Sequence, residues 1–435
     1  MIVAFDTVDI LRRLRFRDLL VPALLAFLCT ATTAAQVEQP SPASRSESNF
    51  ALLEEVWGHV NERFFDPDFN GADWPAMIDR YGEAARQAET DADLANVITA
   101  MLGELNTSHT AYFTKQDPKY YQLLDVFHHL GRAGQIAQMF PEGEVRCAET
   151  GMVTKVIDGK VFVTGIIDGT LAEAAGVLVG DEIISVDGRP YLPHQSARRD
   201  AGPPETFTIK RSADAESILE LTFAREVIRP TEMFLRAMSE SVAVAEHNGI
   251  SVGYVHIWSW AGEHYQDRLV ELLQSEPLRD ADALVLDIRD GWGGARPRYV
   301  NIFRRDLPVM LMKTRDEDWT DGDPQWRKPV VLLINEGSRS GKEIIAYTFK
   351  SCDIGPVVGT TTGGAVTGGT AIVLSDGSLL YLAVGDVLID GKRLEGVGVE
   401  PDIFVPFDVR YAAGVDPQRQ RAIEVAAEEV RRERR

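Results

Sequence analysis

Residues 329–350 read PVVLLINEGSRSGKEIIAYTFK, an apolar run followed by a polar turn and an amphipathic stretch. Pro329–Ile334 is short and strongly apolar, which predicts a buried strand. Ser340–Lys350 repeats apolar side chains on one face at helical spacing, which predicts a helix. A serine between a strand and a helix lies at the edge of a sheet, beside the partial positive charge of the helix N-terminus. Ser340 is therefore a candidate nucleophile; the alternative is that Ser338 or Ser340 only caps the helix.

The alternation of strands and helices extends outward from this stretch. Val252–Trp258 and Ala283–Ile288 are predicted strands, with helical stretches between them. The second of these strands runs into Asp287–Gly294, which reads DIRDGWGG. Backbone N–H groups crowded by glycines at a strand end can point toward a developing negative charge. Taken in isolation, such a block is better explained as a tight turn.

The chain before residue 250 has a different pattern in each of two parts. Apolar periodicity predicts three helices that begin near Phe50, Trp74 and Asp91. Short β-rich runs follow from Gly151, with a tight-turn signal at Asp187-Gly188. These patterns divide the chain into seven segments. They are a signal peptide (1–35), a linker (36–48), a helical domain (49–115), an unassigned connection (116–150), a β-rich domain (151–230), an α/β domain (231–410) and a C-terminal helix (411–435). We expect the last helix to be a solvated surface element.

Length and charge limit the possible functions. The chain has 435 residues, of which 45% are hydrophobic and 26% charged, and this composition is typical of a globular protein of two or three domains. The formal net charge is −21, which argues against a nucleic-acid partner because phosphate binding needs a concentrated basic face. After the N-terminal segment only Cys147 and Cys352 remain, and two free buried thiols are a simpler expectation than one bridge.

The N-terminus has the features of an export signal. Four arginines between positions 12 and 17 precede the apolar stretch Leu19–Leu28, and small residues lead to a predicted cleavage site before Gln36. The apolar stretch is short for a bilayer span. We therefore expect a periplasmic or secreted protein with no stable membrane insertion once the signal is removed, and an uncleaved anchor is the alternative.

A serine nucleophile needs a base, because its hydroxyl is barely ionised at neutral pH. None of the eight histidines belongs to a zinc-binding His-Glu-x-x-His pattern. His109 is the candidate base, since it follows a predicted helix in a polar loop, directly after Ser108. On its own, His109 is more simply interpreted as an ordinary hydrogen-bonded histidine.

Five blocks, taken in order, resemble the tail-specific (C-terminal processing) and tricorn-like serine proteases of peptidase family S41. They are a segment from Val56 to Trp74, Leu102–Thr110, a Gly-Val, Gly-Asp-Glu-Ile and Val-Asp-Gly series between Ala174 and Gly188, Asp-x-Arg-x-x-x-Gly-Gly at 287–294 and Ser-x-Ser-x-x-Glu at 338–343. The resemblance covers essentially the whole chain after the signal. It implies a multidomain α+β fold with a helical N-terminal domain, a PDZ-like β-rich domain and a crotonase/ClpP-like α/β catalytic core.

The resemblance also assigns residues to catalytic roles. It implies that Ser340 is the nucleophile, and that the oxyanion donors are the N–H groups of Gly341 and of Gly293 or Gly294. In the tricorn-like members a histidine, a neighbouring serine and a glutamate complete the site. These residues correspond to the three positions His109, Ser108 and Glu395, with Glu400 as a weaker candidate for the glutamate.

One block departs from the tail-specific pattern, in which a Thr-x-Gly-Lys-Gly segment carries a lysine base. The corresponding segment here is Thr362-Gly-Gly-Ala365-Val366, and the methyl group of Ala365 cannot accept a proton. Lys342 does not obviously replace that lysine, because it lies two residues along the helix from Ser340. The lysine is absent, whereas Ser108, His109 and a glutamate are present. This combination favours a histidine base of the tricorn-like kind.

The sequence therefore predicts an exported serine endopeptidase that hydrolyses peptides or unfolded proteins through an acyl-enzyme, without a metal or cofactor. His109 would take the proton of Ser340 and return it to the leaving amine, while Glu395, helped by Ser108, holds the ring. The PDZ-like domain would bind an extended peptide at a strand edge. The alternative is a catalytically silent, PDZ-containing peptide-binding protein of the same fold, in which Ser340 and His109 lie beyond hydrogen-bond reach. A hydrolase of small amides or esters is a third possibility, and the sequence does not indicate an oligomeric state.

Overall fold

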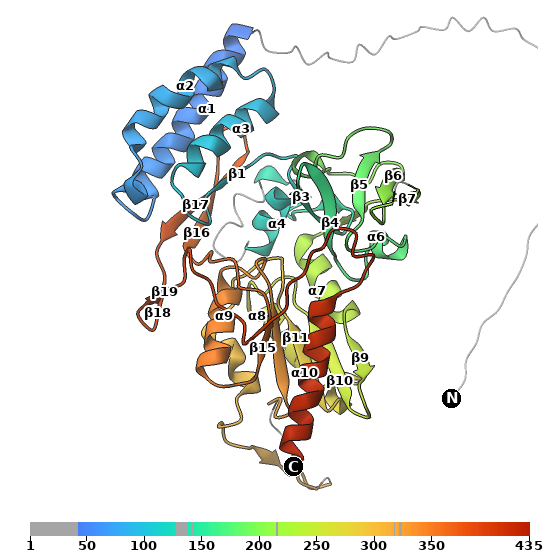
Figure 1. Cartoon of the computed structure of the whole chain (residues 1–435). Helices are drawn as coiled ribbons and strands as arrows, with labels where there is room; N and C mark the ends of the chain where they lie inside the picture. The colour runs from blue at the N-terminus through green and yellow to red at the C-terminus, as the bar shows by residue number, and fades with distance from the viewer. Residues whose placement is uncertain (1–41, 128–137, 141, 215, 317, 322–323) are drawn as a thin grey trace, which may run out of the picture. The chain divides into compact units, whose positions relative to one another are not determined.

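The computed structural model describes residues 42–127, 138–140, 142–214, 216–316, 318–321 and 324–435 (Figure 1). The predicted signal peptide and the first residues of the predicted linker, 36–41, lie outside these ranges. Helix α1, Pro42–Arg63, shows that the linker prediction was wrong for residues 42–48. The polar residues there form the exposed first turns of a helix that Asn49 anchors, since its Nδ2 donates to the carbonyl oxygens of Ala85 and Ala88. No helix in the described part of the chain is long and apolar enough to cross a bilayer.

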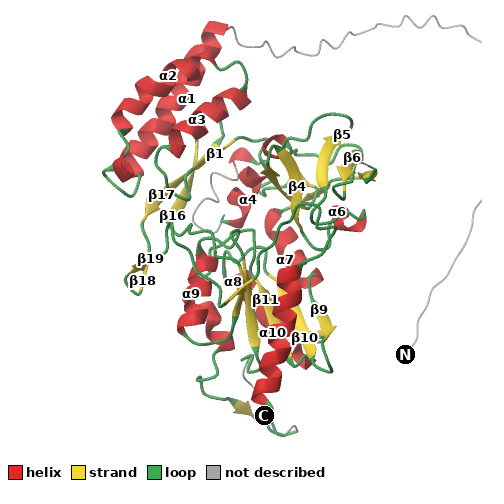
Figure 2. Ribbon diagram, in the orientation of Figure 1, coloured by secondary structure: helices red, strands yellow, loops and turns green. Residues whose placement is uncertain are grey.

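The α/β region is built on one six-stranded sheet (Figure 2). Its strands in spatial order are β20 (Ile403–Phe404), β15 (Val357–Gly359), β14 (Val330–Ile334), β11 (Ala283–Asp287), β10 (Ser251–His256) and β9 (Ala243–Glu246). All neighbours are parallel except β9 and β10, which are antiparallel. The three predicted apolar strands of this region are confirmed as β10, β11 and β14. The carboxyl end of β11 leads directly into the glycine-rich loop, and that of β14 into the Ser340 turn.

Both faces of this sheet are covered by helices. Alternate side chains of its central strands point to opposite faces, so each strand contributes to both cores. Leu284, Leu286 and Leu332 pack in one core with helices α7 (Pro230–Glu240), α8 (Glu263–Leu273) and α9 (Gly341–Ser351). Val285, Val331 and Leu333 pack on the other face with helix α10 (Pro417–Glu433). The prediction that the C-terminal helix is a solvated element was therefore wrong. A stripe of small apolar side chains, hidden among its many charges, faces the sheet: Ala422, Val425, Ala426, Ala427 and Val430.

The three N-terminal helices share a core with strands from much later in the chain. Helices α1, α2 (Met77–Gln87) and α3 (Asp91–Gly103) pack on β1 (Ala111–Phe113), β16 (Gly368–Val373) and β17 (Leu379–Gly385). These strands form a sheet in the order β1-β17-β16, with antiparallel pairing throughout. Strand β1 begins two residues after His109. The pairing of β1 with β17 thus brings the end of the helical segment to the α/β region.

The β-rich segment forms a separate five-stranded antiparallel sheet in sequential order. Its strands are β3 (Met152–Ile157), β4 (Lys160–Ile166), β5 (Glu182–Val186), β6 (Glu205–Lys210) and β7 (Ile218–Phe223). Helix α6 (Leu171–Ala174) lies between β4 and β5, and Val163, Phe207 and Ile209 are in the core of this segment.

The connection that the sequence left unassigned contains helix α4 (Pro118–Val126) and strand β2 (Cys147–Glu149), which pairs with β8 (Glu226–Ile228). Of the two free thiols, Cys147 is buried, but Cys352 is exposed. The expectation that both are buried was wrong for Cys352, which lies at the C-cap of α9 beyond its apolar face.

The burial of α10 leads to a stability prediction. Ala426→Asp places a carboxylate between the helix and the sheet, and we expect it to lower the free energy of unfolding by about 3 kcal/mol or more. Gln420→Asp, at an exposed position of the same helix, is the control, with an expected change within about 0.5 kcal/mol. Urea denaturation followed by circular dichroism measures both. Equal effects of the two changes would contradict the packing of α10 against the sheet.

Candidate active site

Ser340 occupies a strained turn between strand β14 and helix α9. Its backbone angles are φ 58° and ψ −127°, a combination that residues other than glycine rarely adopt. A simple helix-capping serine has extended backbone angles and needs no such strain. Strain of this kind persists only where surrounding contacts enforce it, and it is concentrated at functional sites. The conformation therefore favours the nucleophile interpretation over the cap.

The Glu343 carboxylate enforces this turn. Its Oε2 accepts hydrogen bonds from the backbone N–H groups of Ser340 (3.2 Å) and Ala365 (2.7 Å). Its Oε1 accepts from the Gly364 N–H (2.7 Å) and the Thr362 hydroxyl (2.6 Å). Burial raises the pKa of Glu343, although these donors act to lower it. Sequence analysis used Glu343 only to align a motif and missed that it joins the Ser340 turn to the 362–365 segment.

The glycine-rich loop lies directly against Ser340. A Cβ atom on Gly293 would be 2.7 Å from the Cβ of Ser340, and one on Gly341 would be 2.2 Å from the backbone nitrogen of Ala295. No side chain fits at either position, so glycine is required for the close approach. Within the described residues, the backbone N–H groups of Gly293, Gly294 and Gly341 donate no hydrogen bond. Three unused donors therefore lie close to the candidate nucleophile.

The second half of the site centres on Ser108. Its hydroxyl oxygen is 2.8 Å from His109 Nδ1 and donates to Glu395 Oε2 at 2.8 Å. The Ser108 N–H donates to Glu395 Oε1 at 2.7 Å. Glu395 also accepts from the N–H groups of Val366 (2.6 Å) and Thr367 (3.2 Å). The structure thus brings Glu395, Ser108 and His109 together in that order, whereas Glu400 is exposed and outside the group.

Thr367 is a further member of this group that sequence analysis missed. Its hydroxyl lies 2.9 Å from the Ser108 hydroxyl and 3.3 Å from the Ser108 carbonyl oxygen. Its position directly before β16 follows from the hairpin that pairs with β1. A threonine at the start of a strand carries no sequence signal for this role.

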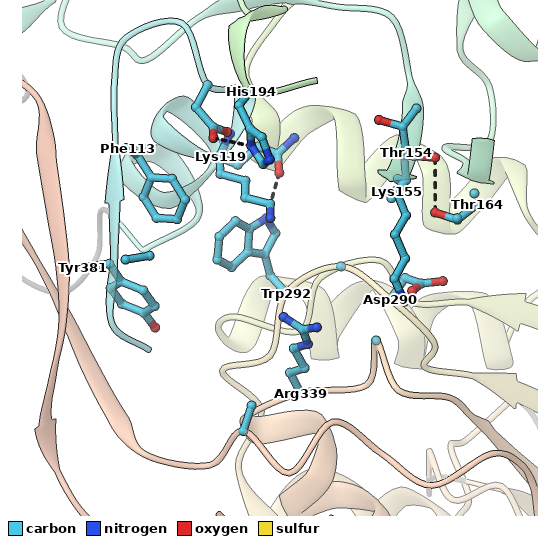
Figure 3. Close-up of a pocket in the computed structure, with 18 of the residues that line it drawn as sticks. Phe113, Lys119, Thr154, Lys155, Thr164, His194, Asp290, Trp292, Arg339 and Tyr381 are labelled. Carbon is cyan, nitrogen blue, oxygen red and sulfur yellow. Dashed lines mark hydrogen bonds and ion pairs between the residues drawn. The ribbon is translucent and has the colours of Figure 1, made fainter. Parts of the chain in front are cut away.

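The two halves of the site face one cavity of about 1870 Å³. Ser340 and His109 both line it. Trp292, Arg339 and Tyr381 line it too, and Figure 3 shows these three side chains. The rings of His109 and Tyr381 are 5.4 Å apart between centroids. No hydrogen bond joins Ser340 to His109 among the side chains that the structure describes. The cavity is therefore lined by both the candidate nucleophile and the candidate base, which no hydrogen bond between described residues joins.

The charges of the site suit a neutral histidine beside an ionised glutamate. Burial lowers the pKa of His109 to about 4; the charge of Glu395 opposes this change and that of Arg339 adds to it. Burial acts to raise the pKa of Glu395, but the donors from Ser108, Val366 and Thr367 outweigh it and lower the pKa. At neutral pH His109 can therefore accept a proton, and Glu395 is in position to stabilise the cation that results.

The surroundings of Lys342 do not favour a role as base. Its side chain is completely buried, and Nζ donates to the backbone carbonyl oxygens of Trp258 (3.2 Å) and Asp290. Burial lowers its pKa to about 7. The ammonium group thus fastens the base of the glycine-rich loop, a contact that the sequence did not suggest. In the described ranges, no three His, Cys, Asp or Glu side chains gather in a way that could hold a metal ion.

The role of Glu343 can be tested by its removal. We expect Glu343→Ala to lower the free energy of unfolding by about 3 kcal/mol, because buried N–H and O–H donors lose their acceptor. Glu336→Ala removes an exposed carboxylate from the same turn, and we expect a change within about 0.5 kcal/mol. Chemical denaturation of both variants measures the difference. If the Glu343→Ala protein is as stable as the parent, other contacts must hold the Ser340 turn.

Comparisons with known proteins match two segments of the chain to family models. The model "Peptidase family S41" matches residues 251–405, and the model "Tricorn protease C1 domain" matches residues 50–103. Tricorn protease homolog 1 of Streptomyces coelicolor is 27% identical, over 86% of this chain and 35% of the relative. The carboxyl-terminal-processing protease of Synechocystis is 25% identical, over 87% of this chain and 88% of the relative. The chain thus spans about a third of the tricorn homologue but most of the length of the processing protease.

Solved structures agree on the fold. The crystal structure of the tricorn protease superposes with a TM-score of 0.51 at 20% identity, over 89% of this chain and 37% of that chain. Mature CPAF superposes with a TM-score of 0.52 at 13% identity, over 89% of this chain and 98% of that chain. At these identities the likeness concerns the fold alone. The matched family models, and not this likeness, confirm the predicted resemblance: the chain carries a domain of peptidase family S41 at residues 251–405 and a tricorn protease C1 domain at residues 50–103.

Proposed function

We propose that this protein is an exported endopeptidase that cleaves peptide bonds through an acyl-enzyme on Ser340, with His109 as general base. The observation that carries the proposal is the hydrogen-bonded series from Glu395 through Ser108 to His109, which faces the same cavity as the strained Ser340 turn. A nucleophile, a base and a residue that orients the base are the parts that acyl transfer requires.

The hydrogen bonds around Ser108 support one tautomer of His109. The ionised Glu395 carboxylate can only accept, so the single Ser108 hydroxyl proton is directed to it. The Ser108 oxygen then accepts a hydrogen bond from Nδ1–H of His109. Nε2 consequently carries a lone pair and can take the proton of Ser340 in the transition state. In this scheme Ser108 conveys the orienting effect of Glu395 to the ring.

The free backbone donors support an oxyanion hole. The N–H groups of Gly341 and of Gly293 or Gly294 would donate to the oxygen of the tetrahedral intermediate, at the N-terminus of α9. Lys342 would act indirectly, because its ammonium group binds the carbonyl oxygens of Arg289 and Asp290, which precede these glycines. Ala365, at the position of the tail-specific lysine, supplies only its backbone to Ser340: the Ser340 N–H donates to the Ala365 carbonyl at 2.8 Å.

The remaining parts of the proposal concern domains, substrates and location. We assign residues 151–230 to a PDZ-like domain on the strength of the five-stranded sheet and the short α6 helix, and residues 231–410 to a crotonase/ClpP-like catalytic core. One relative is named a carboxyl-terminal-processing protease, which supports C-terminal peptide segments as substrates of this chain. Unfolded segments are a further substrate class that the family resemblance implies. The arginine-rich, apolar N-terminus supports export to the periplasm or exterior by a signal peptide that ends at residue 35.

The rival function is a silent peptide-binding protein, and one observation favours it. Ser340 and His109 make no hydrogen bond with each other among the described residues, as that alternative requires. Catalytic hydrogen bonds are, however, often long before substrate binds and tighten only in the complex. Peptide binding alone requires neither the strain at Ser340 nor the Ser108 bridge, whereas acyl transfer uses both. The peptidase is therefore the better-supported function.

Active-site labelling separates the two functions. We expect a fluorophosphonate probe to label purified residues 36–435, and Ser340→Ala or His109→Ala to abolish labelling. Lys342→Met should keep detectable labelling, because a base role for Lys342 is not part of the scheme. Ser338→Ala is the matched control for loss of a nearby hydroxyl. A folded parent that stays unlabelled, with peptides present or absent, would support the silent protein.

The pKa of His109 predicts the pH dependence of activity. A base must be neutral, so kcat/KM should fall as the pH drops through about 4 and stay level up to neutral pH. Since the charge of Glu395 raises that pKa, Glu395→Gln should move the acid limb to lower pH and reduce kcat/KM at pH 7 by about 100-fold or more. Glu400→Gln is the control. A quenched-fluorescence peptide assay measures the profile; an acid limb near the ordinary histidine pKa, about 6.5, would exclude this environment for the base.

A further inference from the structure

We infer that Arg339 binds a substrate carboxylate beside the scissile bond, either the α-carboxylate of a peptide end or the side chain of Asp or Glu. The inference rests on the proposed function, because it places the carboxylate in the cavity where Ser340 would act. It goes further by naming the chemical group that the site selects.

Arg339 directly precedes Ser340 and is exposed to the cavity that Ser340 and His109 line. Figure 3 shows its side chain rising from the Ser340 loop toward Trp292. The one hydrogen bond that this side chain makes with described residues is a long contact from Nε to the Glu336 carbonyl oxygen, at 3.4 Å. Its two terminal nitrogens have no acceptor, and no carboxylate pairs with it, within the part of the chain that the structure describes. The donors of the guanidinium fork are therefore available to a ligand.

The backbone opposite holds the arginine stem in place. A Cβ atom on Gly363 would lie 2.9 Å from Cγ and 3.3 Å from Nε of Arg339, so the stem packs against a position that must be glycine. This packing reduces the freedom of the side chain before a ligand binds. The charge of Arg339 also lowers the pKa of His109, as expected of a cation that shares its cavity.

Several other cations around the cavity already have partners. Arg289 pairs with the carboxylates of Asp287 and Asp416, each at 2.7 Å. Lys155 lies 3.8 Å from the Glu336 carboxylate, and Lys115 donates to a backbone carbonyl oxygen. The chain as a whole carries a net charge of −21, which repels acidic ligands at long range. No described carboxylate pairs with the Arg339 guanidinium next to Ser340. This group therefore gives a local preference for acidic ligands, which the net negative charge of the chain opposes.

The chemistry of the group defines what it binds. A guanidinium presents a planar fork of N–H donors that matches the two oxygens of a carboxylate, and such charge-assisted pairs are among the stronger hydrogen bonds in proteins. An amide or hydroxyl cannot satisfy both donors with a charged acceptor. Arg339 should therefore distinguish a carboxylate from the corresponding amide.

Binding to the full chain carrying Ser340→Ala tests this inference without turnover. Three kinds of acetylated Ala/Ser hexapeptide serve as probes: a free acid, its C-terminal amide, and amides with one Glu at each position in turn. We expect the free acid, or one of the Glu peptides, to bind about 10- to 100-fold more tightly than the plain amide by calorimetry. Adding Arg339→Met should remove that difference, and Arg339→Lys should keep part of it. Arg268→Met, on the exposed face of α8, is the control that should keep it all.

The pattern of binding identifies the source of the carboxylate. Preference for the free acid indicates an α-carboxylate, and preference for one Glu position indicates an acidic side chain. Equal binding of all peptides to the Ser340→Ala protein, or a preference that survives Arg339→Met, overturns the inference. Cleavage and fluorophosphonate labelling of the parent test the proposed function separately, so a failure of catalysis is distinguishable from a failure of carboxylate selection.

Discussion

The geometry of the site depends on three residues of antiparallel pairing between β1 and β17, with Ala111 opposite Tyr381 and Phe113 opposite Leu379. This short ladder joins the end of the helical segment to a hairpin far later in the chain. Because a strand pair has a fixed register, the residues just before β1 have a defined place beside the start of β16. Ser108 and His109 occupy that place. The pairing thus fixes the place of the candidate base together with the packing of the helices on β17 and the hydrogen bonds of Glu395.

Two carboxylates, the buried Glu343 and the partly buried Glu395, fix the segments that the strand pairing brings together. Glu395 collects backbone N–H groups from the 108 loop and from residues 366–367, while Glu343 collects them from the Ser340 turn and residues 364–365. The same segment, 364–367, is therefore held from both sides, and it lies between nucleophile and base. Burial works against ionisation in both cases; for Glu395 the donors prevail and its pKa falls, whereas for Glu343 burial prevails and its pKa rises. The negative charge of Glu395, which lies next to the candidate base, is therefore maintained, and this is the charge that the proposed catalysis would use.

Local patterns were reliable where local physics decides the outcome. The apolar strands β10, β11 and β14 are visible in the sequence because both of their faces are buried, which requires an uninterrupted apolar run. Ser340 stood out because it sits between such a strand and an amphipathic helix. The errors have a common cause. The first turns of α1 and the buried stripe of α10 have polar or highly charged sequences, and only packing against a distant partner shows which of their residues are covered.

By itself, the sequence determined the order of strands and helices, the candidate nucleophile and its glycines, and the departure at Ala365, since each of these is a property of residue type and spacing. Tertiary structure alone decided which carboxylate meets Ser108, that Thr367 joins it, that Lys342 fastens the glycine-rich loop from within, and that no described carboxylate pairs with Arg339. These contacts join residues up to 287 positions apart. Their formation depends on the register of β1 with β17 and on close packing at glycines, which no periodicity along the chain records.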